Sequence, residues 1–355
     1  MQLNPSIIPP TFFMSRALEL AQRGAGHVAP NPMVGAVLVF EGRVIGEGYH
    51  QEYGAAHAEV NCIDSVKEED RTLISQSTLY VTLEPCAHHG KTPPCADLII
   101  RNRIPKVVIG CRDPFVEVDG KGMERLVTAG VGIELGVMAE ECLELNRRFI
   151  TFHQQQRPYI ILKWAQTADA RISGKAGQRL MISNDITNRL VHCWRSEEAA
   201  ILVGTNTAEM DDPELTNRHW SGPSPVRLVI DRSLRLPGGL RLFDGSSRTI
   251  VFNSVKHELG GKLEYYQLKP DKPIVQQILN GLFNMNIQSV LVEGGAKTLQ
   301  SFIDEGAWDE ARIITNTKLR VGEGVEAPVL GDQLKDQEFL VGDDKIEIIR
   351  NNYKL

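Results

Sequence analysis

The pattern of apolar and polar positions divides roughly the first 140 residues into alternating helices and strands. Apolar residues at helical spacing predict helices over residues 13–21, 57–66, 96–102 and 123–129. Apolar runs bounded by turn residues predict strands over residues 34–40, 44–48, 78–83, 106–110 and 131–135, the first two forming a hairpin. This alternation predicts a mixed or parallel sheet with helices on its faces.

The second half of the chain continues the α/β pattern without repeating the first. Residues 140–157 pass from a Glu- and Leu-containing stretch to a run of glutamines, which predicts a connecting helix followed by a polar linker. Strands are then predicted over residues 159–164, 200–204, 226–231, 249–253, 289–293 and 310–314. Because 355 residues are long for one core, we expect two domains, at 1–150 and 151–355.

The first half contains a constellation typical of a catalytic zinc site. His57, Cys86 and Cys95 supply one imidazole and two thiols, the three ligands that a catalytic zinc keeps when water holds its fourth position. Glu59 follows His57 by two residues and is suited to proton transfer. Zinc deaminases of nucleobases have this H-x-E and P-C…C pattern. We therefore expect a zinc-dependent deaminase of the nucleobase type.

Two features leave alternatives open at this site. The eight residues between Cys86 and Cys95 exceed the usual C-x2-C spacing and include His88, His89 and Lys91. These residues either contact substrate or supply a fourth ligand, which would make the site closed and structural and leave Glu59 without a role. Residues two apart also diverge on a helix, so His57 and Glu59 can share a site only at a helix N-terminus.

The second half is less informative by itself. Residues 290–298 predict a strand, a glycine turn and a helix, an arrangement that can bind anions at the helix N-terminus. They match neither a P-loop nor G-x-G-x-x-G, and a tight turn without a ligand is an equal alternative. Asp211 and Asp212 before Pro213 form either a metal pair or, more commonly, a helix end and turn. These residues predict a nucleotide-binding α/β domain.

Composition excludes several classes of protein. The net charge is −6 and no basic block is present, which argues against nucleic-acid binding and against an RNA-editing deaminase. The first ten residues do not resemble a signal peptide, and no apolar run approaches a membrane span. We expect a cytoplasmic protein. The cysteines outside the metal site are expected to be small buried hydrophobes: Cys62, Cys111, Cys142 and Cys193.

Further short motifs lie along nearly the whole length of the chain. The first half carries Pro30-Asn-Pro-Met-Val-Gly35, Gly48-Tyr-His50, His57-Ala-Glu-Val60, Thr82-Leu-Glu-Pro-Cys-Ala-His-His-Gly-Lys-Thr-Pro-Pro-Cys95 and Asp113-Pro114. The second half carries Leu162-Lys-Trp-Ala165, Asp169-Ala-Arg171, Arg195-Ser-Glu197, Gly204 with Thr207, Asp211-Asp-Pro-Glu-Leu-Thr216 and Val292-Glu-Gly-Gly-Ala296. With these motifs the chain resembles, over nearly its whole length, the bifunctional riboflavin-biosynthesis deaminase/reductases of the RibD or RibG family. The long cysteine gap fits this branch of the deaminases.

The resemblance implies a cytidine-deaminase-like three-layer αβα domain followed by a dihydrofolate-reductase-like α/β domain. It implies hydrolytic deamination of a 2,5-diamino-6-ribosylamino-pyrimidinone 5′-phosphate with Zn²⁺, then reduction of the ribosyl group to ribityl with NADPH. The implied partner is this small pyrimidine ribotide, with no nucleic acid or membrane, and a homo-oligomer, dimer or tetramer, is expected. The alternative from another class is a deaminase whose second half is a regulatory nucleotide-binding module.

The resemblance also assigns site residues. In the deaminase pocket it implies substrate contacts from Asn31, His50, His88, Lys91 and Asp113. In the reductase pocket it implies substrate contacts from Lys163, Arg195, Leu215, Arg218 and Glu293. It implies a cofactor lining of Ala165, Thr207, Asp211, Gly295, Ala296, Lys297, Thr298, Leu299, Gln300 and Ser301.

One segment departs from the family pattern. Members often have Ser-x-Trp-Ile-Thr after the glycine that matches Gly177, whereas this chain has Arg179-Leu-Met-Ile-Ser183. Met181 therefore stands where an aromatic surface for the cofactor is expected, and Arg179 stands where a small polar substrate contact is expected.

Overall fold

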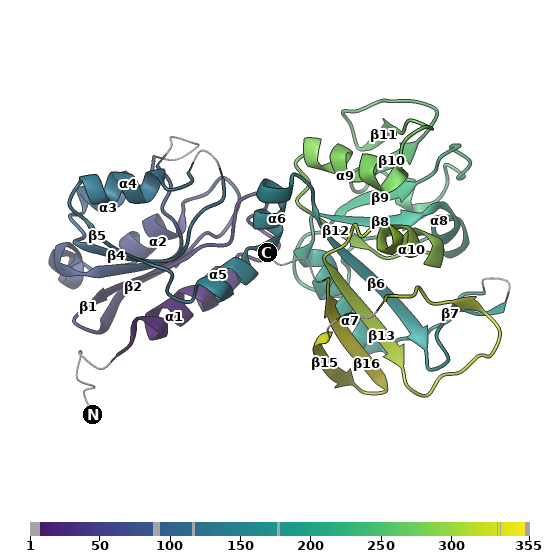
Figure 1. The fold of residues 1–355 in the computed structure, drawn as a ribbon, viewed down its shortest axis with the longest axis horizontal. Helices are drawn as coiled ribbons and strands as arrows, with labels where there is room; N and C mark the ends of the chain where they lie inside the picture. The colour runs from purple at the N-terminus through teal and green to yellow at the C-terminus, as the bar shows by residue number, and fades with distance from the viewer. Residues whose placement is uncertain are drawn as a thin grey trace. The chain divides into compact units, whose positions relative to one another are not determined.

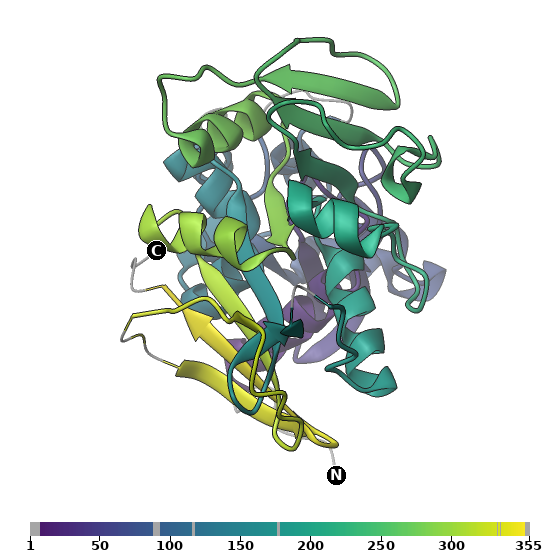
Figure 2. The same ribbon diagram turned by 90° about the vertical axis from the view of Figure 1, so that its right-hand side faces the viewer.

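The computed structural model describes residues 8–87, 93–115, 118–175, 178–331, 333 and 335–351. Its internal contacts divide the chain into two compact units, Met1–Gln155 and Gln156–Leu355. Each unit is a sheet covered by helices (Figures 1 and 2). Among the described residues, no helix is long and apolar enough to cross a membrane.

The first unit is built around a five-stranded sheet in the order β2-β1-β3-β4-β5. β1 pairs antiparallel with β2 and β3, whereas β3, β4 and β5 run parallel. The sheet is therefore mixed, one of the two forms that the sequence predicted. The elements of this unit, including a 3-10 helix at Glu68–Gln76, are α1 (Pro10–Gln22), β1 (Gly35–Phe40), β2 (Arg43–Tyr49), α2 (Ala58–Asp64), β3 (Thr78–Leu83), α3 (Cys95–Arg101), β4 (Lys106–Cys111), α4 (Lys121–Thr128), β5 (Gly132–Leu135), α5 (Ala139–Leu145) and α6 (Arg147–Gln155).

Alternate side chains of the central strands are buried on opposite faces of this sheet. Ala36 and Leu38 of β1 pack in one core with residues of α2, α3 and α4. Val37 and Val39 pack in a second core with residues of α1 and α5. The unit thus has three layers, αβα. The strands β3 and β4 are parallel neighbours, so their carboxyl ends lie side by side. The loops that follow them, which contain Cys86 and Asp113, therefore lie close together.

The second unit contains a nine-stranded sheet in the order β11-β10-β9-β8-β12-β6-β13-β16-β15. The strands from β11 to β13 in this order run parallel, and β16 and β15 add an antiparallel hairpin at one edge. Apart from a 3-10 turn at Arg241–Phe243, its elements are β6 (Tyr159–Thr167), β7 (Arg171–Ser173), α7 (Asp185–Glu197), β8 (Ala200–Gly204), α8 (Thr205–Asp211), β9 (Val226–Ile230), β10 (Thr249–Asn253), β11 (Leu263–Gln267), α9 (Ile274–Asn284), β12 (Ser289–Val292), α10 (Ala296–Asp304), β13 (Glu310–Asn316), β14 (Val325–Glu326), β15 (Lys335–Val341) and β16 (Asp344–Arg350).

Helices cover both faces of the large sheet. α9 and α10 pack against one face in the largest hydrophobic core, which includes Ile160 and Leu162 of β6. α7 packs against the other face, where its Val191 and Trp194 share a core with Ile161 of β6. A further core joins α8 to β8, β9 and β10. The second unit is therefore a helix-covered, mostly parallel α/β domain.

Two expectations about local structure were wrong. The segment expected to be a connecting helix and a polar linker forms two helices, α5 and α6, because Phe149, Ile150 and Phe152 on α6 are buried. The helix expected to reach residue 66 ends at Asp64. The hairpin of β15 and β16 was not predicted, because every residue of β15 except Val341 is exposed and its sequence is mostly polar.

Candidate active sites

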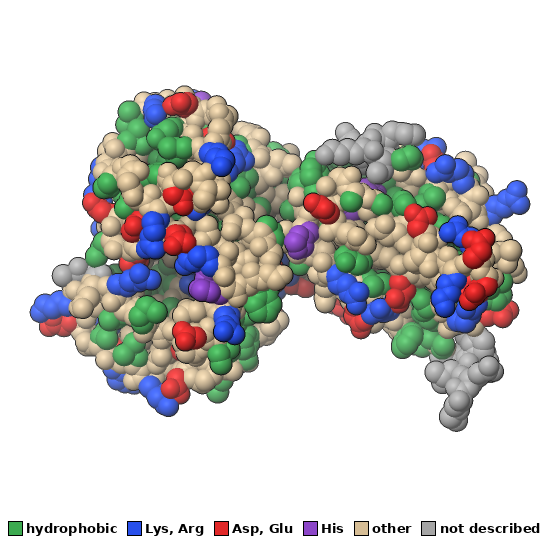
Figure 3. Space-filling model, turned by 180° about the vertical axis from the view of Figure 1, so that it is seen from behind, with side chains coloured by type: hydrophobic (Ala, Val, Ile, Leu, Met, Phe, Trp, Pro, Cys, Tyr) green, Lys and Arg blue, Asp and Glu red, His purple; other side chains and the backbone are tan. Residues whose placement is uncertain are grey.

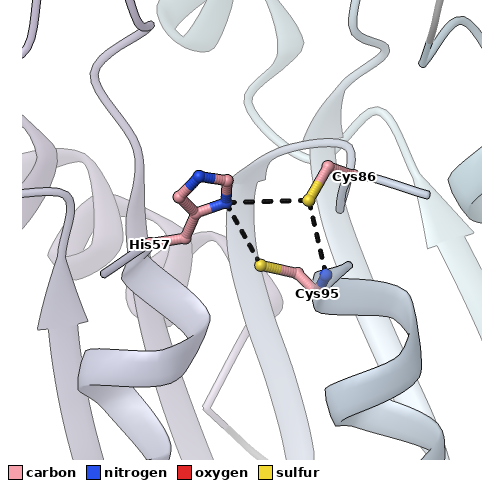
Figure 4. Close-up of side chains that lie close together, drawn as sticks. All are labelled: His57, Cys86 and Cys95. Atoms are coloured by element: carbon pink, nitrogen blue, oxygen red, sulfur yellow. Dashed lines mark hydrogen bonds between the residues drawn. The ribbon is translucent and has the colours of Figure 1, made fainter. Parts of the chain in front are cut away.

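The three predicted zinc ligands come together in the first unit (Figure 4). Nδ1 of His57 lies 3.6 Å from Sγ of Cys86 and 3.3 Å from Sγ of Cys95. The three ligand atoms all lie within 4.8 Å of one another. Tetrahedral zinc, with bonds of about 2.0–2.3 Å, places its nitrogen and sulfur ligands roughly 3.5–3.8 Å apart. The donor set and its spacing therefore fit zinc.

The start of α2 resolves the difficulty of placing His57 and Glu59 at one site. His57 is the N-cap of α2 and has an extended backbone conformation (φ −73°, ψ 166°). The direction of its side chain is therefore not fixed by the helical repeat that separates residues two apart. Glu59 lies in the first turn and is only 3% exposed. Burial raises the pKa of Glu59, and the nearby Cys86 raises it further. A buried carboxyl group with a raised pKa is suited to accept and return a proton.

The two cysteines share one strong hydrogen-bonding environment. The hydrogen bond between the two thiols holds the pKa of Cys86 well below its usual range. The backbone N–H of Cys95, at the start of α3, also donates to Sγ of Cys86 over 3.3 Å. Thiolates are the form in which cysteine binds zinc. These contacts favour the thiolate form of Cys86.

Predicted substrate residues surround the metal ligands. Nδ1 of His50 faces the carbonyl oxygen of Ala56 at 3.0 Å and so carries the proton, while Nε2 accepts from the Asn31 amide at 3.0 Å. The His50 ring lies edge-on to His57, with ring centroids 5.4 Å apart. Asp113 is buried, and this burial raises its pKa to about 7. The other two predicted contacts of this pocket lie outside the described residues: His88 and Lys91.

The second unit brings three predicted residues into one buried ion cluster. Glu293 directly follows β12, Lys163 lies on the neighbouring strand β6, and Arg195 comes from α7. Arg195 Nε and Nη2 donate to the two Glu293 oxygens over 2.8 and 2.7 Å, and Lys163 Nζ lies 3.6 Å from Glu293 Oε2. Burial alone would raise the pKa of Glu293, but Arg195 and Lys163 together lower this pKa to about 2.

A loop beside α7 holds two more predicted residues. Leu215 is buried in a left-handed conformation (φ 52°), and Arg195 Nη1 donates to the carbonyl oxygen of Thr216 over 3.3 Å. The backbone N–H of Arg218 donates to Nδ1 of His192 over 3.0 Å. His192 was not among the residues predicted for this site. The available signal was its position one turn before Arg195 on the same face of α7.

Two glycine segments meet at the predicted cofactor region. A Cβ on Gly204 would lie 2.4 Å from Oγ1 of Thr298, and one on Gly294 would lie 2.9 Å from Cγ2 of Thr207. Gly295 has a positive φ of 68° and is the N-cap of α10. No side chain of the described residues caps the first turn of α10, so its backbone N–H groups can receive an anion. This cradle fits the phosphates of a nucleotide cofactor.

The rest of the predicted cofactor lining is less uniform. Leu299 is 1% exposed and belongs to the hydrophobic core, so only its backbone can face a ligand. Asp211 ends α8, and Asp212 adopts a left-handed conformation and accepts from Arg241, which confirms the helix end and turn expected there. Burial raises the pKa of Asp211, and the nearby Arg179 partly offsets this rise. The departure from the family pattern therefore adds a cation beside this region.

The charges on the surface do not form an extended basic region on the face shown in Figure 3, where acidic and basic side chains are interspersed. This agrees with the net charge of −6. A long polyanion needs many cations along one surface. On this face the distribution lacks the continuous band of cations that a long polyanion needs.

Comparison with known proteins places both units. The family described as the RibD C-terminal domain matches residues 158–355. The family described as the cytidine and deoxycytidylate deaminase zinc-binding region matches residues 10–111. The riboflavin biosynthesis protein RibD of Aquifex aeolicus is 39% identical over 340 residues, which cover 94% of each chain. The RibD of Escherichia coli is 39% identical over 327 residues, covering 87% of this chain and 88% of that protein.

Solved structures are similar over 96% of the chain. A diaminohydroxyphosphoribosylaminopyrimidine deaminase/5-amino-6-(5-phosphoribosylamino)uracil reductase from Thermotoga maritima is 38% identical, with a TM-score of 0.88, and covers 96% of this chain and 98% of its own. The RibD of Acinetobacter baumannii is 30% identical with a TM-score of 0.86, over 96% of this chain and 98% of its own. With its zinc-binding deaminase unit and its reductase unit, this chain belongs to the RibD family of bifunctional riboflavin-biosynthesis enzymes.

Proposed function

We propose that residues 1–150 deaminate a 2,5-diamino-6-ribosylamino-pyrimidinone 5′-phosphate and that residues 151–355 reduce the ribosyl group of the product with NADPH. The observation that carries the first activity is the trio of His57, Cys86 and Cys95 with a buried carboxyl group beside it. The second activity is supported by the buried Lys163–Glu293–Arg195 cluster next to the glycine cradle.

In the deaminase unit, Glu59 moves the protons of the reaction. When bound by the three ligands, Zn²⁺ supplies Lewis acidity that brings the pKa of a water molecule towards neutrality. Glu59 would take one proton from the attacking water and give it to the ring nitrogen as a C–O bond forms at the carbon bearing the amine. Glu59 would then carry the remaining proton of the added hydroxyl to the amine, so that the C–N bond breaks, ammonia leaves and the carbonyl forms. The raised pKa of Glu59 suits both directions of transfer.

We expect Cys86→Ser to lose stoichiometric zinc. A serine hydroxyl is a poor ligand for zinc, and the backbone N–H of Cys95 would lose its sulfur acceptor. Metal analysis of the purified variant by atomic emission measures this directly. Cys193→Ser is the matched control, because Cys193 is partly buried on α7 in the other unit. Full zinc content in Cys86→Ser would refute the ligand assignment.

In the reductase unit, the ion cluster acts on the sugar. NADPH supplies the hydride that reduces C1′ of the ring-opened ribose. Lys163 donates a proton to the ring oxygen as the sugar opens, and burial lowers the pKa of Lys163 and so favours this donation. Glu293 accepts hydrogen bonds from sugar hydroxyls and keeps Lys163 oriented, while Arg195 fixes the Glu293 carboxylate through two hydrogen bonds.

We expect Gly295→Ala to weaken NADPH binding at least tenfold, because its φ of 68° strains an alanine and displaces the N–H groups at the start of α10. Gly306→Ala is the matched control, since Gly306 follows the other end of α10 with a φ of 62° and has open space around it. Fluorescence titration with NADPH compares the two. Equal dissociation constants for both variants would contradict the proposed cradle.

Identification of products tests the whole proposal. The purified chain is mixed with the diaminopyrimidinone ribotide, with and without NADPH, and the products are identified by mass spectrometry. We expect the deaminated ribosyl compound without NADPH and the deaminated ribityl compound with it. Deamination without any NADPH consumption would favour the alternative in which the second unit is a regulatory nucleotide-binding module.

We further propose a cytoplasmic homo-oligomer, a dimer or tetramer, that binds no nucleic acid. Support for the compartment comes from the thiolate metal site and from the six cysteines, all of which are free. Support for self-association comes from β15, an edge strand that exposes Leu340 at 69% and Phe339 at 38%. Exposed edge strands with apolar side chains favour pairing with another chain.

A further inference from the structure

Helix α4 of the deaminase unit contacts both segments that carry the cysteine ligands, although it supplies no ligand itself. We propose that Glu84 and Arg125 are positioning residues that use α4 to hold Cys86, Cys95 and Asp113 in their working arrangement. This inference rests on the proposed deaminase site and adds residues that act on it indirectly. Three sets of contacts carry it.

The first set comes from the Glu84 carboxylate, which lies two residues before Cys86 and is 3% exposed. Its Oε2 accepts from the backbone N–H groups of Asp113 and Gly120 over 3.4 and 3.0 Å. Its Oε1 accepts from those of Gly122 and Met123 over 3.1 and 3.2 Å. A buried carboxylate needs such partners, and these four all come from the segment that begins at Asp113.

The second set is the close approach of α4 to the metal segment. Gly120 is the N-cap of α4, with a φ of 84°, a conformation that favours glycine. A Cβ on Gly122 would lie 1.9 Å from the carbonyl oxygen of Pro85, a contact that no side chain tolerates. The first turn of α4 therefore packs directly on the backbone between Glu84 and Cys86.

The third set comes from Arg125, one turn further along α4. Its Nη1 donates to the carbonyl oxygen of Ala87 over 3.3 Å, and its Nη2 donates to Oδ1 of Asp97 over 2.7 Å. Ala87 follows Cys86 directly, and Asp97 lies in the first turn of α3, two residues after Cys95. One guanidinium group thus connects the two cysteine-bearing segments.

These contacts have a function beyond general stability. Groups that orient metal ligands from behind commonly change metal affinity or activity by about tenfold to a hundredfold when removed. The Arg125 side chain is 45% exposed, so its ion pair with Asp97 adds little to the stability of the fold. Removing it should therefore affect the metal site more than the folded state.

The rate of zinc release tests Arg125. Zinc-loaded full-length protein is mixed with excess pyridylazoresorcinol, and metal transfer is followed by absorbance. We expect Arg125→Met to release zinc at least tenfold faster than the wild type, and Arg125→Lys to fall between them, because an ammonium group can reach only one of the two acceptors at a time. Arg43→Met is the matched control: Arg43 is 56% exposed and forms a bidentate pair with Asp70, which belongs to the 3-10 helix. We expect wild-type release rates from it.

Steady-state kinetics test Glu84. Glu84→Gln keeps the side-chain size but leaves one oxygen for four N–H groups, so we expect at least a tenfold higher KM for deamination through displacement of Asp113. Gly122→Ala removes no polar group but forces α4 away from Pro85, so it should give the same KM effect and faster zinc release. Reductase activity of the same molecules should stay within twofold of the wild type, which reports that the rest of the chain is folded.

The outcomes separate this inference from the proposed function. A wild-type protein that binds no zinc would overturn both. Zinc-loaded wild type together with Arg125→Met and Gly122→Ala variants that match it within twofold in zinc release and deaminase KM would overturn the positioning role alone. An Arg43→Met variant that releases zinc as fast as Arg125→Met would also overturn it, because the loss of any surface ion pair would then be enough to speed zinc release.

Discussion

Glu59→Gln is expected to lose about two to four orders of magnitude in the turnover of deamination while keeping its zinc, since general acid–base groups contribute rate enhancements of this size. Glutamine has the volume and shape of glutamate but can neither take the proton from water nor return it to the ring. Because Glu59 is not one of the three metal ligands, the stoichiometry of bound zinc should stay at the wild-type value.

Product formation in single-turnover and steady-state assays, together with metal analysis, measures both parts of this prediction. Asp64→Asn is the matched control, because Asp64 is an exposed carboxylate at the other end of α2. The Glu59→Gln variant should still reduce its substrate with NADPH at the wild-type rate. A loss smaller than threefold, or a loss of zinc equal to the loss of turnover, would count against the proton-transfer role.

Glu293→Gln is expected to lose about two orders of magnitude or more in reductase turnover, with deamination unchanged. The amide cannot hold Arg195 and Lys163 through the same ionic hydrogen bonds, and a catalytic group displaced by about 1 Å can cost a hundredfold in rate. Removing the charge also leaves two buried cations without their counter-ion, which costs up to about 3–5 kcal/mol in the free energy of unfolding.

The control must therefore separate catalysis from stability. Glu310→Gln serves this purpose, because Glu310 is also a buried, ion-paired carboxylate but lies at the beginning of β13, whereas Glu293 follows the end of β12. The two positions lie on or next to the strands that flank β6, and their partners differ: Glu310 pairs with Arg312 and Arg350, whereas Glu293 pairs with Arg195 and Lys163. Thermal melts should show destabilisation of both variants, and only Glu293→Gln should lose reductase turnover. Equal loss of turnover in both would mean that Glu293 acts through stability alone.

The deaminase site could be predicted in detail because its chemistry is local. The ligand types at His57, Cys86 and Cys95 and the carboxylate at Glu59 are visible in short motifs, and zinc accepts few ligand sets. Even the geometric difficulty of residues two apart had one local solution, a helix beginning at His57, and the structure has that helix start. Three strands of the first sheet, β1, β3 and β4, were equally accessible, because these buried strands carry nearly unbroken apolar runs.

The reductase site depended on the family resemblance, because its charges are distant in sequence. Arg195 and Glu293 are 98 positions apart in the sequence, and no short motif around either residue indicates that it pairs with the other. Their pairing follows from the parallel register of β6 and β12 and from α7 packing over the sheet. The same holds for Glu84, whose four N–H partners lie on a later segment of the chain.

The sequence by itself predicted the ligand chemistry, a proton-transfer residue, the glycine turn before α10, the five strands of the first sheet and six of the nine strands of the second, since each depends on residues close together in the chain. Only the tertiary structure decided that residues 140–157 fold as α5 and α6, that β15 and β16 extend the second sheet, and that Arg125 joins the two cysteine segments. The physical reason is that burial and ion pairing between distant segments depend on strand register and helix packing. Those are properties of the whole fold, whereas motif spacing and hydrophobic period are properties of short stretches of chain.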